Sequence, residues 1–288
     1  MSKPETITCR LCSAASHKIF TKQALGRHSV DYFRCSGCQS IQSEEPYWLD
    51  EAYSIPGVHI DVGCASRTLK NWTSVSTLLA HLSFPRDAVA LDFGAASGLF
   101  GRLMRDVGYN FYSYDKYARP AFTSYHSTDD PTSAQPQLIT AFEVFEHFPN
   151  PKDELDRLFA LQSPLILFTT WFCDDQGEDW VYFVEECGQH VFFYSQQAMR
   201  DIAARHGYEL RSTAFFHILS LTRAITPAQE QVLTDFQFNG EAMARAQNAA
   251  LVESVWQGNA HIDSDFEAAR QRFIAERLLE AEAKASKR

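Results

Sequence analysis

The order of apolar and polar positions predicts a regular alternation of strands and helices from residue 88 onward. Short apolar runs, about the length of buried strands, alternate there with amphipathic stretches about the length of helices. The expected strands cover 88–93, 110–115, 122–126, 137–142, 164–170, 208–216 and 217–223, and the expected helices cover 98–107, 152–161 and 195–206. This alternation is typical of an α/β fold in which helices cover both faces of a mostly parallel sheet.

The segments on either side of this region have different patterns. The first part of the chain carries two pairs of cysteines and little helical periodicity, and one helix is expected after it near 66–83. Thr226 followed by Pro227 is typical of a helix start, and 264–285 is rich in good helix formers. The predicted organisation is an N-terminal module over 1–49, a helical connector over 50–87, an α/β domain over 88–225 and a helical C-terminal extension over 226–288.

Composition and charge limit the classes of protein to which the chain can belong. The 288 residues are 45% hydrophobic and 22% charged, which is ordinary for a globular protein with a full core. The net charge of −10 disfavours binding to nucleic acid or to an anionic membrane. No apolar stretch reaches the roughly 18 residues of a membrane helix, and the first nine residues lack the apolar core of a signal peptide. We therefore expect a soluble, cytoplasmic protein that binds neither nucleic acid nor membrane.

Four cysteines in two C-x2-C pairs predict a zinc site. Cys9 and Cys12 form one pair, Cys35 and Cys38 form the other, and 22 residues separate the pairs. Each pair places two thiolates on one side of a tight turn, for which Gly37 is suited, and four thiolates complete a tetrahedral Zn²⁺ site. Four thiolates leave zinc no open position for catalysis, so its role would be structural. The alternative is a redox-active thiol pair, but such a pair normally occurs once in a protein and not twice. The remaining cysteines are expected to be packing residues: Cys64, Cys173 and Cys187.

A turn of small residues follows the first strand of the α/β region. The stretch Asp-Phe-Gly-Ala-Ala-Ser-Gly over 92–98 leads into a helix whose N-terminus offers free N–H groups to a ligand. Asp115 ends the next strand, where an acidic side chain can accept hydrogen bonds from both ribose hydroxyls. A dinucleotide fingerprint of the form G-x-G-x-x-G fails, because Ala96 and Leu99 occupy the second and third glycine positions. A tight βα turn of an unrelated α/β domain remains the alternative.

Three motifs together resemble class I S-adenosylmethionine-dependent methyltransferases. The pattern D-x-G-x-x-x-G over 92–98 is similar to motif I of that family and departs from its commoner form at Ala96. Residues 137–149, Gln-Leu-Ile-Thr-Ala-Phe-Glu-Val-Phe-Glu-His-Phe-Pro, resemble the fourth-strand motif, and 189–208 are similar to the later H-x-x-F-[ST] and G-[FY] motifs. The resemblance covers about 88–223. With its four N-terminal cysteines, the chain resembles zinc-containing relatives of deoxysugar C-methyltransferases, which usually carry a longer C-terminal portion than the tail 226–288.

The resemblance implies a Rossmann-like methyltransferase sheet and a set of residues that bind S-adenosylmethionine. The glycine turn would line the amino-acid end of the cofactor, Asp115 its ribose, and Asp129 or Asp130 the adenine amine. Tyr53 and Arg67 lie before the domain, where Arg67 would meet the cofactor's carboxylate unless it is simply solvated. The expected cofactor-binding residues are Asp92, Gly94, Ala95, Ala96, Gly98, Asp115, Lys116, Phe142 and Glu143.

Candidate catalytic residues follow the fourth-strand motif. Glu146 and His147 lie just past a strand's carboxyl end, where the ligand sites of open α/β sheets gather. We expect His147 to act as the base that takes a proton from the acceptor, with capping of the following turn as its alternative role. His190 is the second candidate base. It follows the aromatic and acidic loop 171–189, which forms either an acceptor lid or part of the core.

These features predict methyl transfer from S-adenosylmethionine to a small-molecule acceptor, and the resemblance implies a sugar or nucleotide-sugar. An NAD-dependent oxidoreductase is disfavoured by the glycine spacing. A catalytically inactive, zinc-bearing interaction protein with a methyltransferase-like domain is the main alternative function. The C-terminal helix has an apolar face that would either pack on its own domain or join two chains in a homodimer. This face consists of Phe266, Ala269, Phe273 and Leu279.

Overall fold

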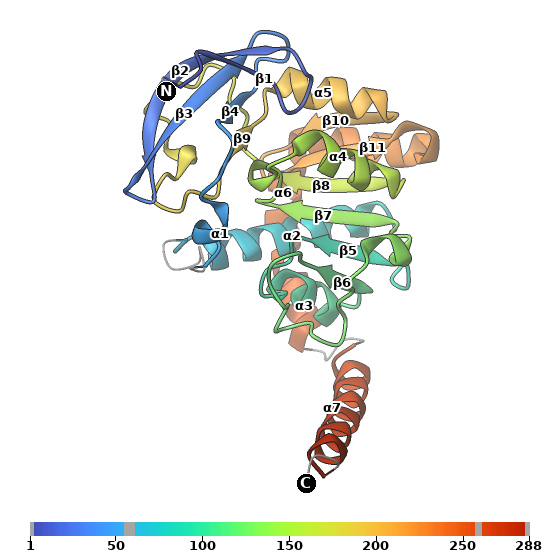
Figure 1. Cartoon of the computed structure of the whole chain (residues 1–288). Helices are drawn as coiled ribbons and strands as arrows, with labels where there is room; N and C mark the ends of the chain where they lie inside the picture. Colours follow the sequence, from blue (N-terminus) through green and yellow to red (C-terminus); the bar gives the residue numbers. More distant parts are fainter. Residues whose placement is uncertain (1–2, 55–60, 257–260, 286–288) are drawn as a thin grey trace.

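The computed structural model describes residues 3–54, 61–256 and 261–285 and builds them around two β-sheets (Figure 1). The larger sheet has the strand order β10-β11-β8-β7-β5-β6. Its strands are β5 (Ala90–Phe93), β6 (Phe111–Tyr114), β7 (Leu138–Phe142), β8 (Leu165–Thr169), β10 (Tyr208–Ser212) and β11 (His217–Leu221). Strands β6, β5, β7 and β8 run parallel, and β11 is antiparallel to both of its neighbours. The predicted α/β fold with a mostly parallel sheet is confirmed.

Helices cover both faces of this sheet because its central strands are apolar on both sides. One face packs against α2 (Cys64–His81), α3 (Leu99–Asp106) and α6 (Pro227–Trp256), whose buried side chains share one core cluster. The other face packs against α4 (Pro151–Ala160) and α5 (Gln196–Arg205), which belong to a second cluster. Helix α6 lies along α2, so the first half of the predicted C-terminal extension helps to bury the sheet.

The order of the parallel strands predicts a ligand crevice at the carboxyl ends of β5 and β7. From β5 the chain passes to β6 on one side and then returns to β7 on the other side. The connections after β5 and β7 therefore diverge, and such a switch point opens a crevice at the carboxyl ends of the two strands. The glycine turn and the Glu-His motif follow these two ends.

The N-terminal segment forms a separate five-stranded sheet that the α/β domain completes, and its cysteines lie in the connections between strands or, for Cys35, at a strand end. Its order is β1 (Thr6–Thr8), β2 (Ala15–Ala24), β3 (His28–Cys35), β4 (Ile41–Ser43) and β9 (Phe192–Phe193). Strand β9 comes from the segment after β8, and its residues pair with Ile41 and Gln42. Helix α1 (Leu49–Ala52) follows β4. Through β9, this sheet connects the N-terminal module to the segment that follows β8 of the larger sheet (Figure 1).

The expected strand over 122–126 is wrong. The structure has turns there and one isolated parallel bridge between Ser113 and Ser127. Thr123 is buried and its hydroxyl donates to Ser113 Oγ at 2.7 Å, while the backbone of Ser113 pairs at and just beyond the end of the expected strand, with His126 and Thr128. The remaining short helices are η2 (Pro131–Ala134), η3 (Phe145–His147), η4 (Val181–Phe183) and η5 (Thr222–Ala224).

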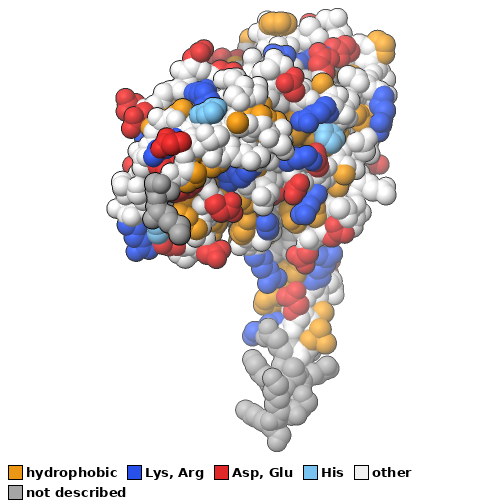
Figure 2. Space-filling model, turned by 45° about the horizontal axis from the view of Figure 1, so that its top comes forward, with side chains coloured by type: hydrophobic (Ala, Val, Ile, Leu, Met, Phe, Trp, Pro, Cys, Tyr) orange, Lys and Arg blue, Asp and Glu red, His pale blue; other side chains and the backbone are white. Residues whose placement is uncertain are grey.

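Helix α7 (Ile262–Ala285) is fixed at its start and then projects away from the sheets (Figures 1 and 2). Buried Asp265 accepts hydrogen bonds from Arg105 Nη2 at 2.6 Å and from Arg102 Nη1 at 2.7 Å. Phe266 and Phe273 on the predicted apolar face are exposed, so packing of this face on its own domain is wrong. Within the described residues, none of the helices combines the length and the apolar composition that a membrane span requires.

Candidate active site

The turn after β5 requires glycine at two positions. Gly94 has φ 73°, and a Cβ there would lie 2.5 Å from Val144 Cγ2. Gly98 has φ 77°, and its Cβ would lie 2.3 Å from Thr123 Oγ1. Positive φ and close neighbours exclude a side chain at both positions. The turn therefore passes close to the segments that follow β6 and β7, at the mouth of the crevice.

Asp115 joins this turn to the segment after β6. Its Oδ2 accepts the N–H of Ala96 at 2.8 Å, and its Oδ1 accepts the N–H groups of Tyr117 at 2.8 Å and Ala118 at 2.7 Å. A carboxylate offers about four acceptor sites, so half-buried Asp115 retains acceptor capacity for a ligand hydroxyl. Lys116 is exposed, with its ammonium 5.1 Å from the ring centre of Tyr117.

Asp92 lies beneath the turn and links two strands. Its Oδ1 accepts the hydroxyl of Thr140 on β7 at 2.9 Å, and its side chain is buried. Burial raises the pKa of Asp92 to about 7, while the hydrogen bond from Thr140 opposes this shift. Asp92 therefore joins the end of β5 to β7 and to the backbone of Gly101 on α3.

Phe142 and Glu143 at the end of β7 have different surroundings. Phe142 packs between Phe100 and Phe216, with ring centres 5.1 Å and 6.2 Å away. Glu143 has φ 55°, and its N–H donates to Thr169 Oγ1 at 2.8 Å. This left-handed backbone is uncommon for a residue other than glycine and is often found at functional sites.

Three predicted catalytic residues come together beyond Glu143. Glu146 and His147 lie in η3, and His190 lies just before β9. One ligand atom of each residue can be chosen so that all three lie within 4.8 Å of one another. The two imidazole rings are 4.8 Å apart and nearly perpendicular. Tyr182 Oη donates to Glu146 Oε1 at 2.7 Å and lies 3.3 Å from Glu143 Oε2.

Burial keeps these groups in their neutral forms near neutral pH. It raises the pKa of Glu146 to about 8, and the neighbouring Glu143 carboxylate adds to this shift. Burial also lowers the pKa of His190 to about 4, and lowers that of His147 well below its ordinary value with a contribution from His190. Such a group of perturbed side chains in a crevice is typical of a functional site.

Tyr53 connects the two sides of the crevice. Its ring stacks on Tyr117 at 4.5 Å, and its hydroxyl lies 3.3 Å from His147 Nδ1. Trp48, at the start of the same short helix, donates to the carbonyl of Gly188 at 2.7 Å and so fixes this helix over the segment that carries His190. The pairing of Tyr53 with His147 was missed from the sequence, because the two residues are 94 positions apart.

Two further residues expected near the cofactor have other partners. Arg67 forms an ion pair with Asp61 at 2.6 Å. Asp130 caps the short helix η2, where its Oδ1 accepts the N–H of Thr132 at 2.9 Å. Neither contact involves the glycine turn.

Most aromatic side chains of the loop 171–189 pack in or against the core. Tyr182 and Phe183 are buried, and Phe183 packs on Phe20 and Tyr32 of the N-terminal sheet. Trp171 is 54% exposed and stacks on Tyr182 with an interplanar angle of 8°. Only part of the loop therefore offers an aromatic surface to a ligand.

The four N-terminal cysteines converge on one point. Their Sγ atoms all lie within 4.8 Å of one another, with Cys9–Cys38 at 3.8 Å and Cys12–Cys35 at 3.4 Å. Zinc–sulfur bonds of about 2.3 Å in a tetrahedron place the sulfurs about 3.8 Å apart, so the donor set fits Zn²⁺. A Cβ on Gly37 would lie 2.9 Å from Ala14 Cβ, which explains glycine in the second turn.

The other three cysteines are free thiols that differ in burial, and one of them does not pack in the core. Cys173 is buried, as expected of a packing residue, and Cys187 is half-buried. Cys64 is exposed at the start of α2, so the expectation of a packing role is wrong there. Its position at a helix end explains the exposure, since the core-facing residues of α2 begin further along the helix.

Arg10 links the cysteine cluster to the catalytic segment. This side chain donates from Nη1 to the carbonyl of Pro149 at 3.1 Å, and from Nη2 to the carbonyls of Val191 at 2.8 Å and Ser43 at 3.1 Å. Burial lowers the pKa of Arg10 to about 10, which leaves it charged at neutral pH. The guanidinium therefore holds together the segments that follow His147 and His190.

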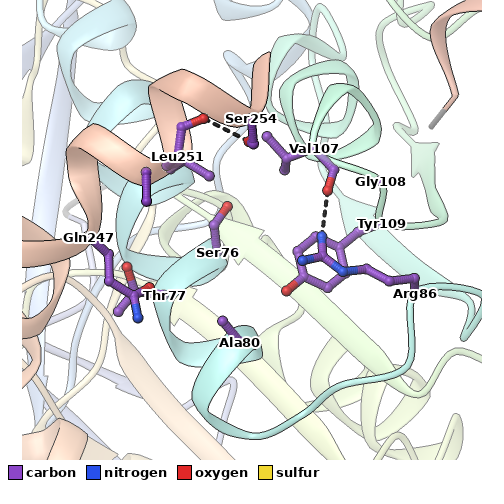
Figure 3. Close-up of a pocket in the computed structure, with 11 residues that line it drawn as sticks. Ser76, Thr77, Ala80, Arg86, Val107, Gly108, Tyr109, Gln247, Leu251 and Ser254 are labelled. Carbon is purple, nitrogen blue, oxygen red and sulfur yellow. Dashed lines mark hydrogen bonds between the residues drawn. The ribbon is translucent and has the colours of Figure 1, made fainter. Parts of the chain in front are cut away.

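A separate cavity lies near the amino ends of β5 and β6, and Figure 3 shows the residues that line it. It measures about 450 Å³ and opens between α2, α6 and the end of α3. Arg86 and Tyr109 on its wall precede β5 and β6, with the guanidinium 3.8 Å from the ring centre. This position, at the amino ends of the strands, separates the cavity from the glycine turn and the catalytic group.

Comparison with known proteins identifies the family. A family model described as a methyltransferase domain matches residues 65–213, just over half of the chain. The chain therefore belongs to the methyltransferase domain family, and the predicted enzyme class is confirmed. A search of curated proteins found no match.

Several solved structures are similar to this chain at low sequence identity. One is 1,6-didemethyltoxoflavin-N1-methyltransferase of Burkholderia thailandensis, with 14% identity, a TM-score of 0.45, and coverage of 75% of this chain and 97% of that one. Another is magnesium protoporphyrin IX methyltransferase of Synechocystis PCC 6803, with 12% identity, a TM-score of 0.43, and coverage of 59% and 90%. Human N-acetylserotonin methyltransferase has 15% identity, a TM-score of 0.40, and coverage of 52% and 51%.

Proposed function

We propose that the chain transfers a methyl group from S-adenosylmethionine to a small-molecule acceptor in the crevice between β5 and β7. One observation carries the proposal: the glycine turn with Asp115 faces the group of Glu146, His147 and His190, and Tyr53 contacts both sides. The bound cofactor supplies a methyl group on a positively charged sulfonium. The chain's own part is to place the two ligands in line and to prepare the acceptor for attack.

The side chains divide into a cofactor side and an acceptor side. Asp115, with acceptor capacity left, would bind ribose hydroxyls, and the bare backbone from Gly94 to Gly98 would allow close approach of the amino-acid end. The prediction that His147 takes a proton from the acceptor is supported by its neutral form and by its place beside Tyr53. Glu146 and His190 would orient the acceptor next to it.

The acceptor class implied by the sequence, a sugar or nucleotide-sugar, stays a proposal. Trp171 presents an exposed aromatic face beside Tyr182, and Glu143 lies next to that tyrosine. Carboxylates accept hydrogen bonds from hydroxyls, and flat aromatic faces pack against apolar ring surfaces. The combination suits a ring that carries several hydroxyl groups.

We further propose that Cys9, Cys12, Cys35 and Cys38 bind one structural Zn²⁺. The geometry fits, and backbone N–H groups of Leu11, Gly37 and Cys38 point to sulfurs of the cluster at 3.3–3.4 Å. Hydrogen bonds of this kind favour thiolates. Elemental analysis of tag-free protein should find about one zinc per chain, and a zinc-free protein with a folded N-terminal sheet would contradict the proposal.

Calorimetric titration tests the cofactor. S-adenosylmethionine and S-adenosylhomocysteine should both bind, NAD should not, and Asp115→Ala should abolish binding. Asp201→Ala, at an exposed position on α5, is the matched control. Because Asp115 also accepts three backbone N–H groups, far-UV circular dichroism must show that its variant is folded. Lack of binding by the folded wild-type protein would instead favour the inactive, zinc-bearing interaction protein.

The exposed face of α7 supports a homodimer proposal. Phe266, Phe273 and Leu279 are each more than half exposed on a helix that projects from the body. Apolar side chains in such a row commonly mark an interface between protein chains. Sedimentation equilibrium should show a dimer that Phe273→Glu dissociates, and a monomeric wild-type chain would refute this.

A further inference from the structure

Glu146 has a buried oxygen atom that the methyl-transfer proposal leaves unexplained. Its side chain is fully buried, and Oε1 accepts the hydroxyl of Tyr182 at 2.7 Å. Oε2 is buried too and has no hydrogen-bond partner among the residues that the structure describes. Burying a carboxyl oxygen without a hydrogen-bond partner destabilises the folded protein, so this atom is a candidate ligand-binding atom.

Two imidazoles lie beside this oxygen. Chosen ligand atoms of Glu146, His147 and His190 lie within 4.8 Å of one another. Three ligand atoms at about 2.1 Å from an ion in a tetrahedral arrangement lie about 3.4 Å apart, so the group would need to close by up to about 1.4 Å. Small side-chain rotations provide a movement of this size.

His190 is already held as a metal-binding histidine would be. Its Nδ1 lies 2.6 Å from the carbonyl oxygen of Tyr182, so Nδ1 carries the proton and donates it. The lone pair is then at Nε2. Histidine ligands of metals commonly donate their second ring N–H to a backbone carbonyl in this manner.

Among the described residues, the nearest cation is Arg67, which acts on Glu143 and His190 through its charge but pairs with Asp61. In the part of the chain covered by the structure, neither Glu143 nor Glu146 forms an ion pair with Lys or Arg within 4.0 Å. Tyr182 donates its hydroxyl to Glu146 Oε1 at 2.7 Å and lies 3.3 Å from Glu143 Oε2. The buried Thr170 hydroxyl also acts on Glu146 and favours its ionised form. The converging donors are therefore one carboxyl group, which would release its proton to bind a cation, and two neutral imidazoles.

We propose that Glu146, His147 and His190 bind a divalent cation on the acceptor side of the crevice. Two nitrogen donors and one oxygen donor suit first-row transition metals such as Mn²⁺, Fe²⁺, Co²⁺, Ni²⁺ or Zn²⁺ better than Ca²⁺, which takes oxygen ligands. Three protein ligands leave coordination positions open for an acceptor. The site is distinct from the four-cysteine cluster in both its position and its donors.

This inference deepens the proposed methyl transfer and rests on it for the role of the ion. A hydroxyl oxygen of the acceptor would bind in an open position, where the cation lowers the pKa of that hydroxyl and its proton passes to solvent water. His147 would then serve as a metal ligand and not as the base. The proposal also favours acceptors with two neighbouring oxygen atoms, which can both bind one ion.

Direct measurement of Mn²⁺ binding tests the site without cofactor or acceptor. The full chain is purified with its zinc retained, and Mn²⁺ is titrated while the electron paramagnetic resonance signal of free Mn²⁺ is recorded. Mn²⁺ is a suitable probe because it does not favour the thiolates of the cysteine cluster. We expect one Mn²⁺ bound per chain in addition to the zinc, and no bound Mn²⁺ would overturn the inference.

The key variant is His190→Asn. An asparagine amide can still donate to the carbonyl of Tyr182, as Nδ1 does, but it has no atom at the position of Nε2. Affinity for Mn²⁺ should fall at least about tenfold, and Glu146→Gln should have a similar effect. His17→Ala, at an exposed position on β2, is the control and should bind as the wild type does. Equal binding by the wild type and His190→Asn, with both proteins folded, would exclude this site.

The result separates the cation site from the methyltransferase proposal. S-adenosylmethionine binding without Mn²⁺ binding would refute the cation site and leave methyl transfer in place. Mn²⁺ binding that depends on His190, in a chain that does not bind S-adenosylmethionine, would establish the site and refute the proposed function.

Discussion

Replacement of Asp92 by asparagine tests how burial of this carboxyl group, directly before the glycine turn, affects stability. The Asp92 side chain is buried between β5 and β7, and burial raises its pKa from 3.8 to about 7, against the hydrogen bond from Thr140. The folded state therefore holds a proton that the unfolded state releases between these two pH values. The stabilisation is fully present below pH 4 and is lost as the pH rises through 7.

The size of the effect follows from the two pKa values. Between pH 5 and pH 8, ionisation of Asp92 should lower the wild-type free energy of unfolding by about 3 kcal/mol relative to a group that does not titrate. Asparagine does not ionise, and its Oδ1 can still accept the hydroxyl of Thr140. The stability of Asp92→Asn relative to the wild type should therefore increase by about 3 kcal/mol over this range.

Urea unfolding at several pH values, followed by far-UV circular dichroism, measures this difference. Comparison with the wild type at each pH cancels the titration of all other groups. Asp129→Asn removes an exposed carboxylate and should show a nearly constant difference. A difference for Asp92→Asn that stays constant within about 0.5 kcal/mol would refute the reasoning, because hydrogen bonds to the ionised carboxylate would then outweigh its burial.

Three further substitutions test the site. His147→Ala should sharply reduce turnover, either as a lost base or as a lost metal ligand, while S-adenosylmethionine affinity stays within about a few-fold; normal turnover would exclude both roles. Gly94→Ala should abolish cofactor binding, since its Cβ would meet Val144 at 2.5 Å, and Gly94→Ala combined with Val144→Ala should recover part of it in the same titration. Arg10→Met should lower the free energy of unfolding by about 2–4 kcal/mol, because it leaves three carbonyls without their charged donor; a loss below about 0.5 kcal/mol in urea unfolding would contradict this.

The elements that the sequence predicted correctly are those specified by neighbouring residues. Apolar runs of strand length marked β5, β6, β7 and β8, and a proline after Thr226 marked the start of α6. The cysteine pairs and the glycine turn were also recognisable, because a C-x2-C turn and a positive φ are properties of a few consecutive residues. These local rules failed at 122–126, where Thr123 bonds to a side chain on β6 and turns replace the strand.

The parts that only the tertiary structure decided join residues far apart in the chain. Strand β9 completes the N-terminal sheet by pairing with β4, about 150 positions earlier. In the site, Tyr53 meets His147, and Tyr182 satisfies one oxygen of Glu146 and leaves the other unpaired. No periodicity or spacing encodes such contacts, because they depend on how separate elements pack once the chain has folded. The sequence by itself therefore determined the class of domain and the turn that would bind its cofactor, whereas packing decided which buried groups face the acceptor.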